Sequence, residues 1–339
     1  MYHFGVRDVR CTDEYHWLTE YVGMRLLRFM DAEDAHGLGI RLAGMGLAPR
    51  EDMDDDPILA AELVGLKLTN PIGLAAGFDK HGEAMEGMLG AGLGFVEVGT
   101  VTPVPQVGNP RPRMFRLPED RAVINRFGFN SEGLNAVVPR VEAFLRRRAE
   151  DPRSMPRVGA VGLNIGKNKT AEALPDYIAG VKASAPVADY LTVNISSPNT
   201  PGLRALQRRE TMQALLEAVV KERDAIDWVA LDRDPCPVLV KVAPDLSPVE
   251  VTDVCEASVA AGVQGLIVSN TTIARPESLV GEHKAEGGGL SGRPLKEPSL
   301  RVLREASAAL GGRLPLVGVG GIESGEDAYA KIRAGACAV

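Results

Sequence analysis

Residues 238–270 read VLVKVAPDLSPVEVTDVCEASVAAGVQGLIVSN, and this stretch decides the fold. It opens with the apolar run Val238–Val242 and closes with a second run, Leu266–Asn270, each short enough to be a buried strand. The longer segment between them, Pro248–Ala261, is predicted to be a helix. A strand, a helix and a second strand in this order indicate a βα unit of a parallel sheet.

The same alternation continues on both sides of this stretch. Further strands are predicted at Pro71–Gly77, Phe95–Thr100, Val158–Asn164, Tyr190–Asn194 and Leu316–Gly320, and a last one begins at Cys337. Further helices are predicted at Glu210–Arg223, Leu300–Leu310 and Gly325–Ala334. Eight such strands favour an α/β fold of the closed (β/α)₈ type, the TIM barrel, over an open sheet. No G-x-G-x-x-G motif follows the first strand, which counts against a Rossmann fold.

The first 56 residues have a different pattern from the rest of the chain. Two short helices are predicted from about Glu14 to Leu47, the second starting near Asp31 and Asp34. Their apolar faces would carry Trp17, Tyr21, Met24 and Leu27 in the first helix, and Leu38, Leu42 and Met45 in the second. The acidic run Glu51–Pro57 reads as a linker. We therefore predict a helical segment at residues 1–56 and a barrel domain at residues 57–339.

Composition and charge exclude several classes of protein. The net charge of -7 argues against a general nucleic-acid binder, because such proteins need clustered Lys and Arg. The four cysteines form no C-x-x-C pair and the five histidines show no ligand spacing, so we expect neither a metal site nor a disulfide framework. The sequence contains no apolar stretch of about 18 residues, so we predict no membrane-spanning helix. The start of the chain also lacks the apolar core of a secretory signal.

Polar side chains and glycines follow the predicted strands, at the end of a barrel where active sites lie. A single Asn in such a place is more often a turn residue. Several Asn from different strands, joined by Asn125 and Asn130 from the long connection Val101–Arg157, instead suit a planar ligand whose edge alternates N–H and C=O groups. The clusters Gly287–Gly292 and Gly318–Gly321 lie where barrels commonly bind phosphate, although glycines also serve tight turns.

Nine motifs in this order resemble the class 2, quinone-dependent dihydroorotate dehydrogenases: AAGFDKHGE, GNPRPR, INR with GFN, GKNK, VNISSPNTPGLR, LVKVAPDL, SNTT, GGLSG and GVGGI. The resemblance covers about Glu14 to Val339. It implies oxidation of (S)-dihydroorotate to orotate in de novo pyrimidine (UMP) biosynthesis, with FMN as cofactor and a ubiquinone-type acceptor.

The resemblance also implies the residues that would bind FMN. They are Ala75, Ala76, Gly77, Thr100, Asn164, Asn194, Lys241, Ser269, Ser291, Gly292, Gly320 and Gly321. Lys241 would stabilise the anionic reduced flavin, whereas a lysine with no such role would extend from a surface.

The same resemblance implies the substrate site. Dihydroorotate or orotate would be held by Lys80, Asn125, Phe129, Asn130, Asn194, Asn199, Asn270 and Thr271. Ser197 matches the catalytic base that takes a proton from C5 while C6 gives a hydride to the flavin. Serine is a weak base without help, so Thr200 and the segment 127–129 are expected to enclose a water path. The alternative for Ser197 is a purely structural turn, and Ser196 is the control.

The N-terminal helices would form an apolar lid that touches the membrane surface and admits a quinone, with His36 and Arg116 as candidates at the quinone site. Amphipathic helices also commonly cap a core, and this alternative stays open. We expect a membrane-associated protein, at the mitochondrial inner membrane in a eukaryote or at the cytoplasmic face of the inner membrane in a bacterium.

Other functions remain as alternatives. A flavin barrel that reduces uracil in tRNA should carry a basic face and a Cys at the place of Ser197, and a phosphate-binding isomerase barrel would not need the amides. The chain stops at Val339, inside the predicted eighth strand, where the family continues with the rest of the strand and a helix. We therefore expect a truncated strand, loss of barrel closure, low stability and weak FMN binding, and an impaired member that serves only as a binding module is a further alternative.

Overall fold

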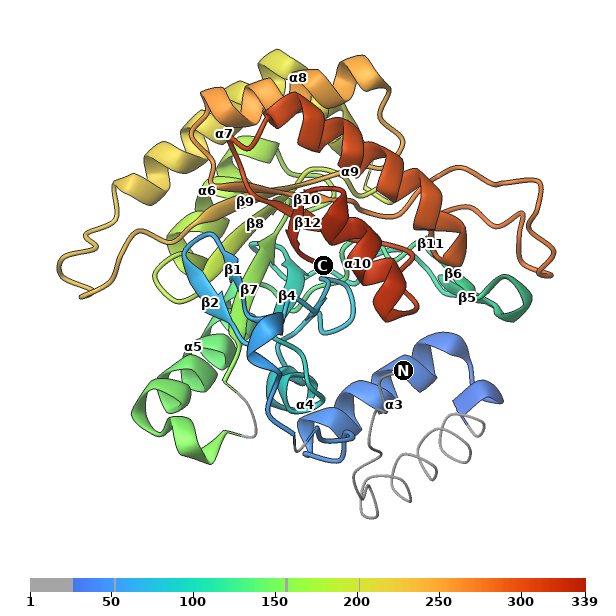
Figure 1. Cartoon of the computed structure of the whole chain (residues 1–339), viewed down its shortest axis with the longest axis horizontal. Helices are drawn as coiled ribbons and strands as arrows, with labels where there is room; N and C mark the ends of the chain where they lie inside the picture. Colours follow the sequence, from blue (N-terminus) through green and yellow to red (C-terminus); the bar gives the residue numbers. More distant parts are fainter. Residues whose placement is uncertain (1–26, 52, 156–157, 201) are drawn as a thin grey trace, which may run out of the picture.

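Eight parallel strands form the centre of the molecule (Figure 1). The computed structural model describes residues 27–51, 53–155, 158–200 and 202–339. Round the sheet the strands run in the order β3 (Gly73–Leu74), β4 (Phe95–Val101), β7 (Ala160–Ile165), β8 (Tyr190–Asn194), β9 (Val238–Val242), β10 (Gly265–Val268), β12 (Leu316–Gly318) and β13 (Ala336–Ala338). The predicted parallel barrel is confirmed.

The end of the last strand meets the start of the first strand. Strand β13 pairs with β12, and the Val339 N–H donates a hydrogen bond to the Pro71 carbonyl at 2.8 Å. The Gly73 N–H in turn donates to the Val339 carbonyl, also at 2.8 Å. The barrel is therefore nearly closed. The eighth strand is short, as expected, and β13 and β3 remain the two edges of the sheet, but these two hydrogen bonds span the gap between them, so closure is reduced and not lost.

Helices cover the outside of the barrel (Figure 1). They are α4 (Met85–Gly90), α5 (Leu134–Glu150), α6 (Ala173–Ser184), α7 (Arg209–Asp224), α8 (Pro248–Ala260), α9 (Lys296–Leu310) and α10 (Gly325–Arg333). Helix α8 shows why they begin where they do. The Ser247 side chain accepts from the Glu250 N–H while the Glu250 carboxylate accepts from the Ser247 N–H, and Pro248 occupies the first turn.

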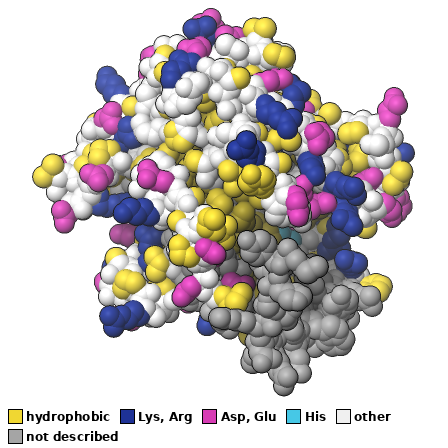
Figure 2. Space-filling model, in the orientation of Figure 1, with side chains coloured by type: hydrophobic (Ala, Val, Ile, Leu, Met, Phe, Trp, Pro, Cys, Tyr) yellow, Lys and Arg dark blue, Asp and Glu magenta, His cyan; other side chains and the backbone are white. Residues whose placement is uncertain are grey.

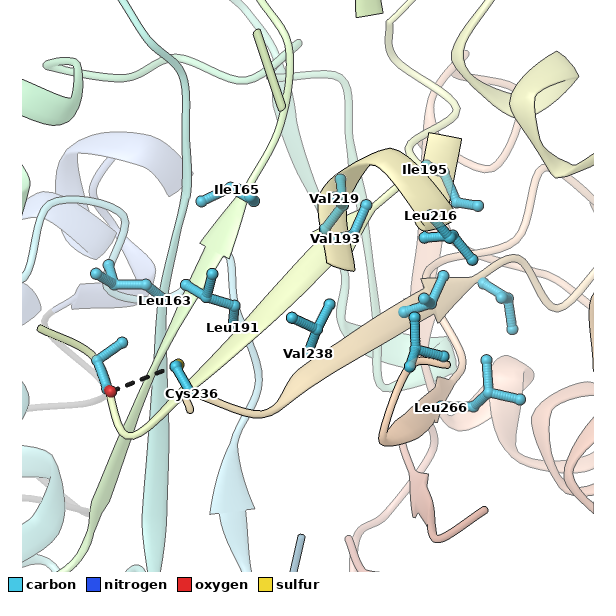
Figure 3. Packing of buried hydrophobic residues seen from close by; sticks show 14 of the residues in the cluster. Leu163, Ile165, Leu191, Val193, Ile195, Leu216, Val219, Cys236, Val238 and Leu266 are labelled. Carbon is cyan, nitrogen blue, oxygen red and sulfur yellow. Dashed lines mark hydrogen bonds between the residues drawn. The ribbon is translucent and has the colours of Figure 1, made fainter. Parts of the chain in front are cut away.

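The hydrophobic core has two layers. Between strands and helices, outward-facing side chains such as Leu191 and Val193 pack against Leu216 and Val219 of α7 (Figure 3). Inside the barrel the rings of Phe95 and Tyr190 join a separate cluster, which the hairpin of β1 (Ala61–Leu63) and β2 (Leu66–Leu68) closes from below. A Cβ at Gly162 would lie 2.1 Å from the Tyr190 ring, so this strand needs a glycine there.

A small antiparallel sheet lies beside the barrel, and the sequence did not predict it. It consists of β5 (Met114–Leu117), β6 (Ala122–Asn125) and β11 (Gly289–Gly292). Short 3₁₀ helices complete the fold at η2 (Pro57–Leu59), η3 (Pro118–Asp120), η4 (Pro152–Ser154), η5 (Leu203–Gln207) and η6 (Arg293–Leu295). Since β6 pairs with β11, Asn125 is set opposite Gly289 near the mouth of the barrel.

Helix α3 (Ala32–Gly44) is the second of the predicted N-terminal helices, and Asp31 caps it as predicted. The first lies almost entirely outside the described residues. The buried face of α3 consists of Ala32, Ala35, Ile40 and Ala43, and Leu42 and Met45 are exposed. Leu42 and Met45 belong to the predicted apolar face, and the buried face is instead made of small residues because α3 packs closely on α4: a Cβ at Gly87 would lie 2.4 Å from the Ala43 carbonyl. None of the described helices has the length and apolar character needed to cross a bilayer.

Candidate active site

A cavity of about 350 Å³ lies where the barrel strands end, and a second cavity of about 290 Å³ adjoins it. The two share Ala75, Lys241, Val319 and Gly320. Most of the predicted site residues line the first cavity: Ala75, Ala76, Gly77, Lys80, Thr100, Asn125, Phe129, Asn130, Asn194, Ser197, Asn199, Lys241, Ser269, Asn270, Thr271, Ser291 and Gly320, with His36. The structure therefore brings together residues that are spread over most of the barrel sequence.

The remaining predicted residues lie elsewhere. Gly292 and Gly321 line the second cavity. Asn164 is fully buried behind the wall of the first cavity, where its side-chain oxygen accepts hydrogen bonds from Thr100 and Asn194. Arg116 lines neither cavity, and its guanidinium donates to the carbonyls of Leu27, Arg28 and Met30. It fixes the segment that precedes α3.

The glycine loop after β12 is held in place by side chains of α9 and α10. The Ser299 hydroxyl lies 3.0 Å from the Gly320 carbonyl, and the buried Lys331 ammonium donates to the same hydroxyl at 2.7 Å. Because the C=O and N–H of a trans peptide point in opposite directions, the next N–H, that of Gly321, is directed away from Ser299. No acceptor for this N–H exists among the described residues. It can bind an anion in the second cavity.

Lys80 brings an ammonium group to the first cavity, in addition to that of Lys241. Its ammonium donates to the Gly77 carbonyl at 2.5 Å and lies 4.1 Å from the centre of the Phe127 ring. The buried Asp79 carboxylate shapes this loop by accepting from the N–H groups of His81, Glu83 and Ala84. Burial, aided by the nearby Arg113, lowers the pKa of Lys80 to about 8. The charge of Lys80 thus responds to modest changes of pH or of bound anion.

The amides of the cavity wall are oriented by one another. Asn199 donates to the Asn125 carbonyl at 3.1 Å, which joins the loop after β8 to the small sheet. Asn270 donates to the Ser196 hydroxyl at 3.0 Å. The Asn130 side-chain oxygen is buried and has no hydrogen-bond partner among the described residues. Such an oxygen is costly unless a ligand donates to it.

The two neighbouring serines have different surroundings. Ser196 is fully buried, and its hydroxyl donates to the Asn194 side-chain oxygen at 3.1 Å. Ser197 lines the cavity, where its oxygen accepts only a 3.3 Å bond from the Asn199 N–H. Within the described chain no carboxylate or imidazole bonds to Ser197. The nearby Thr200 hydroxyl is buried and has no hydrogen-bond partner among the described residues, so it could bind a water molecule.

Glu97 was missed by the sequence prediction. It is buried in β4 with its carboxylate 3.9 Å from the Lys241 ammonium. The signal was present, because a lone acidic residue inside the apolar run FVEVGT is rarely buried unless it has a partner. Arg113 was also missed, and its buried guanidinium pairs with Glu33 of α3 at 2.7 Å. This pair links α3 to the loop around Asn109, whose carbonyl accepts from Arg113.

Exposed apolar side chains lie along α3 and its flanks, near His36 at the cavity. The His36 Nε2 donates to the Phe78 carbonyl oxygen at 2.9 Å, and the ring packs edge-on against the Phe78 ring. Burial lowers the pKa of His36, so the ring is neutral near pH 7. Exposed apolar side chains follow along this segment: Phe29, Met30, Leu42, Met45 and Leu47. Figure 2 shows hydrophobic side chains gathered in a hollow beside the grey residues.

Comparison with known proteins decides the family. The family model described as "Dihydroorotate dehydrogenase" matches residues 58–339. The chain belongs to the dihydroorotate dehydrogenase family. It is 55% identical over 318 residues to the dihydroorotate dehydrogenase (quinone) of Xanthobacter autotrophicus, covering 93% of this chain and 86% of that protein. It is 49% identical over 330 residues to the mitochondrial dihydroorotate dehydrogenase (quinone) of Mus musculus, covering 97% and 82%.

Solved structures agree with this family. The dihydroorotate dehydrogenase of Eimeria tenella, in a complex with ferulenol, superposes with a TM-score of 0.87 at 46% identity, covering 91% of this chain and 85% of that one. The predicted family, class and enzyme type, a quinone-dependent dihydroorotate dehydrogenase, are therefore confirmed. The two other barrel functions that the sequence left open are not supported.

Proposed function

We propose that this chain oxidises (S)-dihydroorotate to orotate in pyrimidine biosynthesis, with FMN as its cofactor and a quinone as its acceptor. The observation that carries the proposal is the pair of adjoining cavities. One is walled by amides, Lys80 and Ser197, and the other by glycines, and the buried Lys241 reaches both. This division suits a planar anionic substrate beside a phosphorylated planar cofactor.

The residues present fit FMN. The Gly321 N–H, directed away from Ser299, and the glycines at positions 292 and 320 would receive the phosphate. Ala75, Ala76, Gly77, Thr100, Asn194, Ser269 and Ser291 would contact the ring system, above Asn164. Lys241 would place a positive charge against it. Bound FMN supplies the acceptor for the hydride that leaves the substrate.

The substrate would be held by opposite sides of the first cavity. Lys80 would attract its carboxylate, and Asn125, Asn130, Asn194, Asn199 and Asn270 would bind the edge of its ring, together with Phe129 and Thr271. Ser197 would take the C5 proton, since its oxygen has a lone pair left after the single bond from Asn199. Phe127 and Phe129 in the cavity wall, with the buried Thr200, would keep bulk water from competing.

Quinone would approach past α3. We assign residues 1–56 to quinone access and membrane contact, and residues 57–339 to the barrel. The exposed apolar side chains of α3 and its flanks support contact with a membrane surface, and His36 at the cavity rim supports a path between surface and flavin. Arg116 would act by fixing residues 27–30. The protein would thus be membrane-associated, at the inner membrane of a mitochondrion or a bacterium.

The proposal is tested by steady-state turnover of the purified full chain. With FMN, dihydroorotate and a soluble ubiquinone analogue, we expect one orotate formed for each quinone reduced. Omission of quinone under anaerobic conditions should stop turnover after one equivalent. Orotate formation that does not depend on quinone, or quinone reduction without orotate, would reject it.

A further inference from the structure

A buried charge pair lies in the wall of the second cavity. Glu97 and Lys241 face each other inside the barrel at 3.9 Å, and the side chain of each is at most 5% exposed. No other carboxylate of the described residues lies within 4 Å of the Lys241 ammonium. From β10 and β12 only the apolar Ile267 and Val317 face the same space. A buried ammonium without its partner would be expected to lose its proton.

The carboxylate also determines the direction of a hydrogen-bond network. Glu97 can only accept, so it receives bonds from the Asn164 amide nitrogen at 2.8 Å and from the Thr192 hydroxyl at 2.7 Å. With its nitrogen turned to Glu97, Asn164 directs its oxygen at Thr100 and Asn194, and both donate to it. One acidic group thereby fixes which way the Asn164 amide is turned.

The same order of donors and acceptors continues to Asn194 in the cavity wall. Both hydrogens of the Asn194 amide nitrogen are used, on the Thr100 hydroxyl at 2.9 Å and on Asn164 at 3.1 Å. Its oxygen is therefore turned to the opposite side, where Ser196 and Asn270 donate to it. Glu97 thus acts on two residues that line the first cavity. It faces the Lys241 ammonium directly, and it orients the Asn194 amide through Asn164.

We propose that Glu97 is a positioning residue: it keeps Lys241 protonated beneath the cofactor site and fixes the donor and acceptor faces of Asn164 and Asn194. The role toward the flavin rests on the function proposed above. The opposing effects on Lys241 agree with it, since burial lowers its pKa and Glu97 raises it. Among the described residues the other titratable group beside Glu97 is the buried Tyr190, and burial raises its pKa well above the ordinary value.

The test removes the charge of Glu97 while keeping its shape. In Glu97→Gln the side-chain oxygen can still accept from Asn164, and the new amide nitrogen can donate to the Thr192 oxygen. The matched control is Thr192→Val, which deletes one hydrogen bond to Glu97 but leaves the charge pair. Glu97→Asp is a second variant that retains the charge and moves it away from Lys241. Circular dichroism and thermal melting show which variants fold.

The first readout needs no flavin. In protein with ¹³C-labelled lysine, the Lys241 signal is assigned by its absence in Lys241→Met and is titrated with pH. We expect its pKa to fall by about one to three units in Glu97→Gln, as for loss of an opposite charge at this distance, and by less in Glu97→Asp. Thr192→Val should keep the wild-type value. An unchanged titration in Glu97→Gln, or a wild-type Lys241 that is already neutral at pH 7, would overturn the proposal whether or not the chain binds FMN.

The second readout connects Glu97 to the flavin. The reduction potential of bound FMN, followed against pH, should change slope at a lower pH in Glu97→Gln than in the wild type. In the Lys241→Met background the Glu97 substitution should no longer move this pH. If the wild type fails to bind FMN while the lysine titration shifts as expected, the proposed function fails and the charge pairing stands. If FMN binds and the slope changes at the same pH in both proteins, the role toward the flavin is wrong.

Discussion

The two adjacent serines allow a sharp test at the scale of single residues. Ser197→Ala removes the proposed proton acceptor but none of the amides, so flavin reduction should slow by about 10² to 10⁴-fold while orotate binds nearly as before. Ser196→Ala should lower the free energy of unfolding by about 1–3 kcal/mol and change the reduction rate far less, because Ser196 only supports Asn194 and Asn270. Rapid mixing with dihydroorotate without oxygen measures the rate. Equal rates in the two variants would show that Ser197 is not the base.

Lys80 makes ligand binding depend on pH. Its pKa of about 8 means that it is charged below this pH and neutral above it, so orotate binding should be constant below pH 8 and weaken as the pH rises further. Lys80→Gln should weaken binding by roughly 10- to 100-fold at pH 7 and abolish this pH dependence, consistent with loss of a charged hydrogen bond. The exposed Lys182 provides the control, as Lys182→Gln. Calorimetry at several pH values measures both effects, and a pH-dependent affinity retained in Lys80→Gln would assign the titration to another group.

At the scale of elements, α9 and α10 support the glycine loop through Ser299 and Lys331. Ser299→Ala releases the Gly320 carbonyl and lets the Gly321 N–H turn, so FMN should bind about tenfold more weakly, as expected for one hydrogen bond. Riboflavin, which has no phosphate, should bind with unchanged affinity. Fluorescence titration of the flavin-free protein compares the two ligands. Equal losses for both would mean that Ser299 affects packing and not the phosphate site.

The exposed apolar side of α3 gives a second test at this scale. Replacement of both Leu42 and Met45 by Glu changes exposed positions, so the melting temperature should stay close to that of the wild type. Flavin reduction by dihydroorotate should also be unchanged, whereas binding to lipid vesicles and reoxidation by long-chain quinones should fall. Val249→Glu, an exposed apolar site on α8, is the control. Vesicle binding as strong as that of the wild type would exclude α3 from membrane contact.

The elements also show what the sequence could and could not predict. Strands β8 and β9 have the predicted bounds, since continuous apolar runs mark strands that are buried on both faces. The sheet of β5, β6 and β11 was missed because the pairing of β6 with β11 joins distant segments and depends on tertiary contacts, and because the local hairpin of β5 and β6 has strands of only four residues each. The buried face of α3 could not be read from the sequence, because close packing on α4 selects Ala and Gly, whereas a hydrophobicity pattern selects Leu and Met.

At the scale of the whole molecule, the barrel gathers residues that no local pattern connects. The order of the strands placed the motifs around one mouth, so most of the candidate site could be predicted once the fold was known. Its supports could not be predicted in the same way. Arg113 with Glu33, Ser299 with Lys331 and Glu97 with Lys241 are contacts between distant elements, and their partners are visible only in the folded chain.

The whole molecule also determines the order of events that the account requires. The proposed dihydroorotate site uses the amides of the first cavity, and the proposed quinone path runs past α3, so the two half-reactions should be separable. The most direct measurement is an anaerobic titration of the FMN-loaded full chain with dihydroorotate, followed by visible absorption. We predict that one equivalent bleaches one bound flavin and yields one orotate, and that a later addition of quinone restores the spectrum. A flavin that binds stoichiometrically and stays oxidised in excess dihydroorotate would contradict the account.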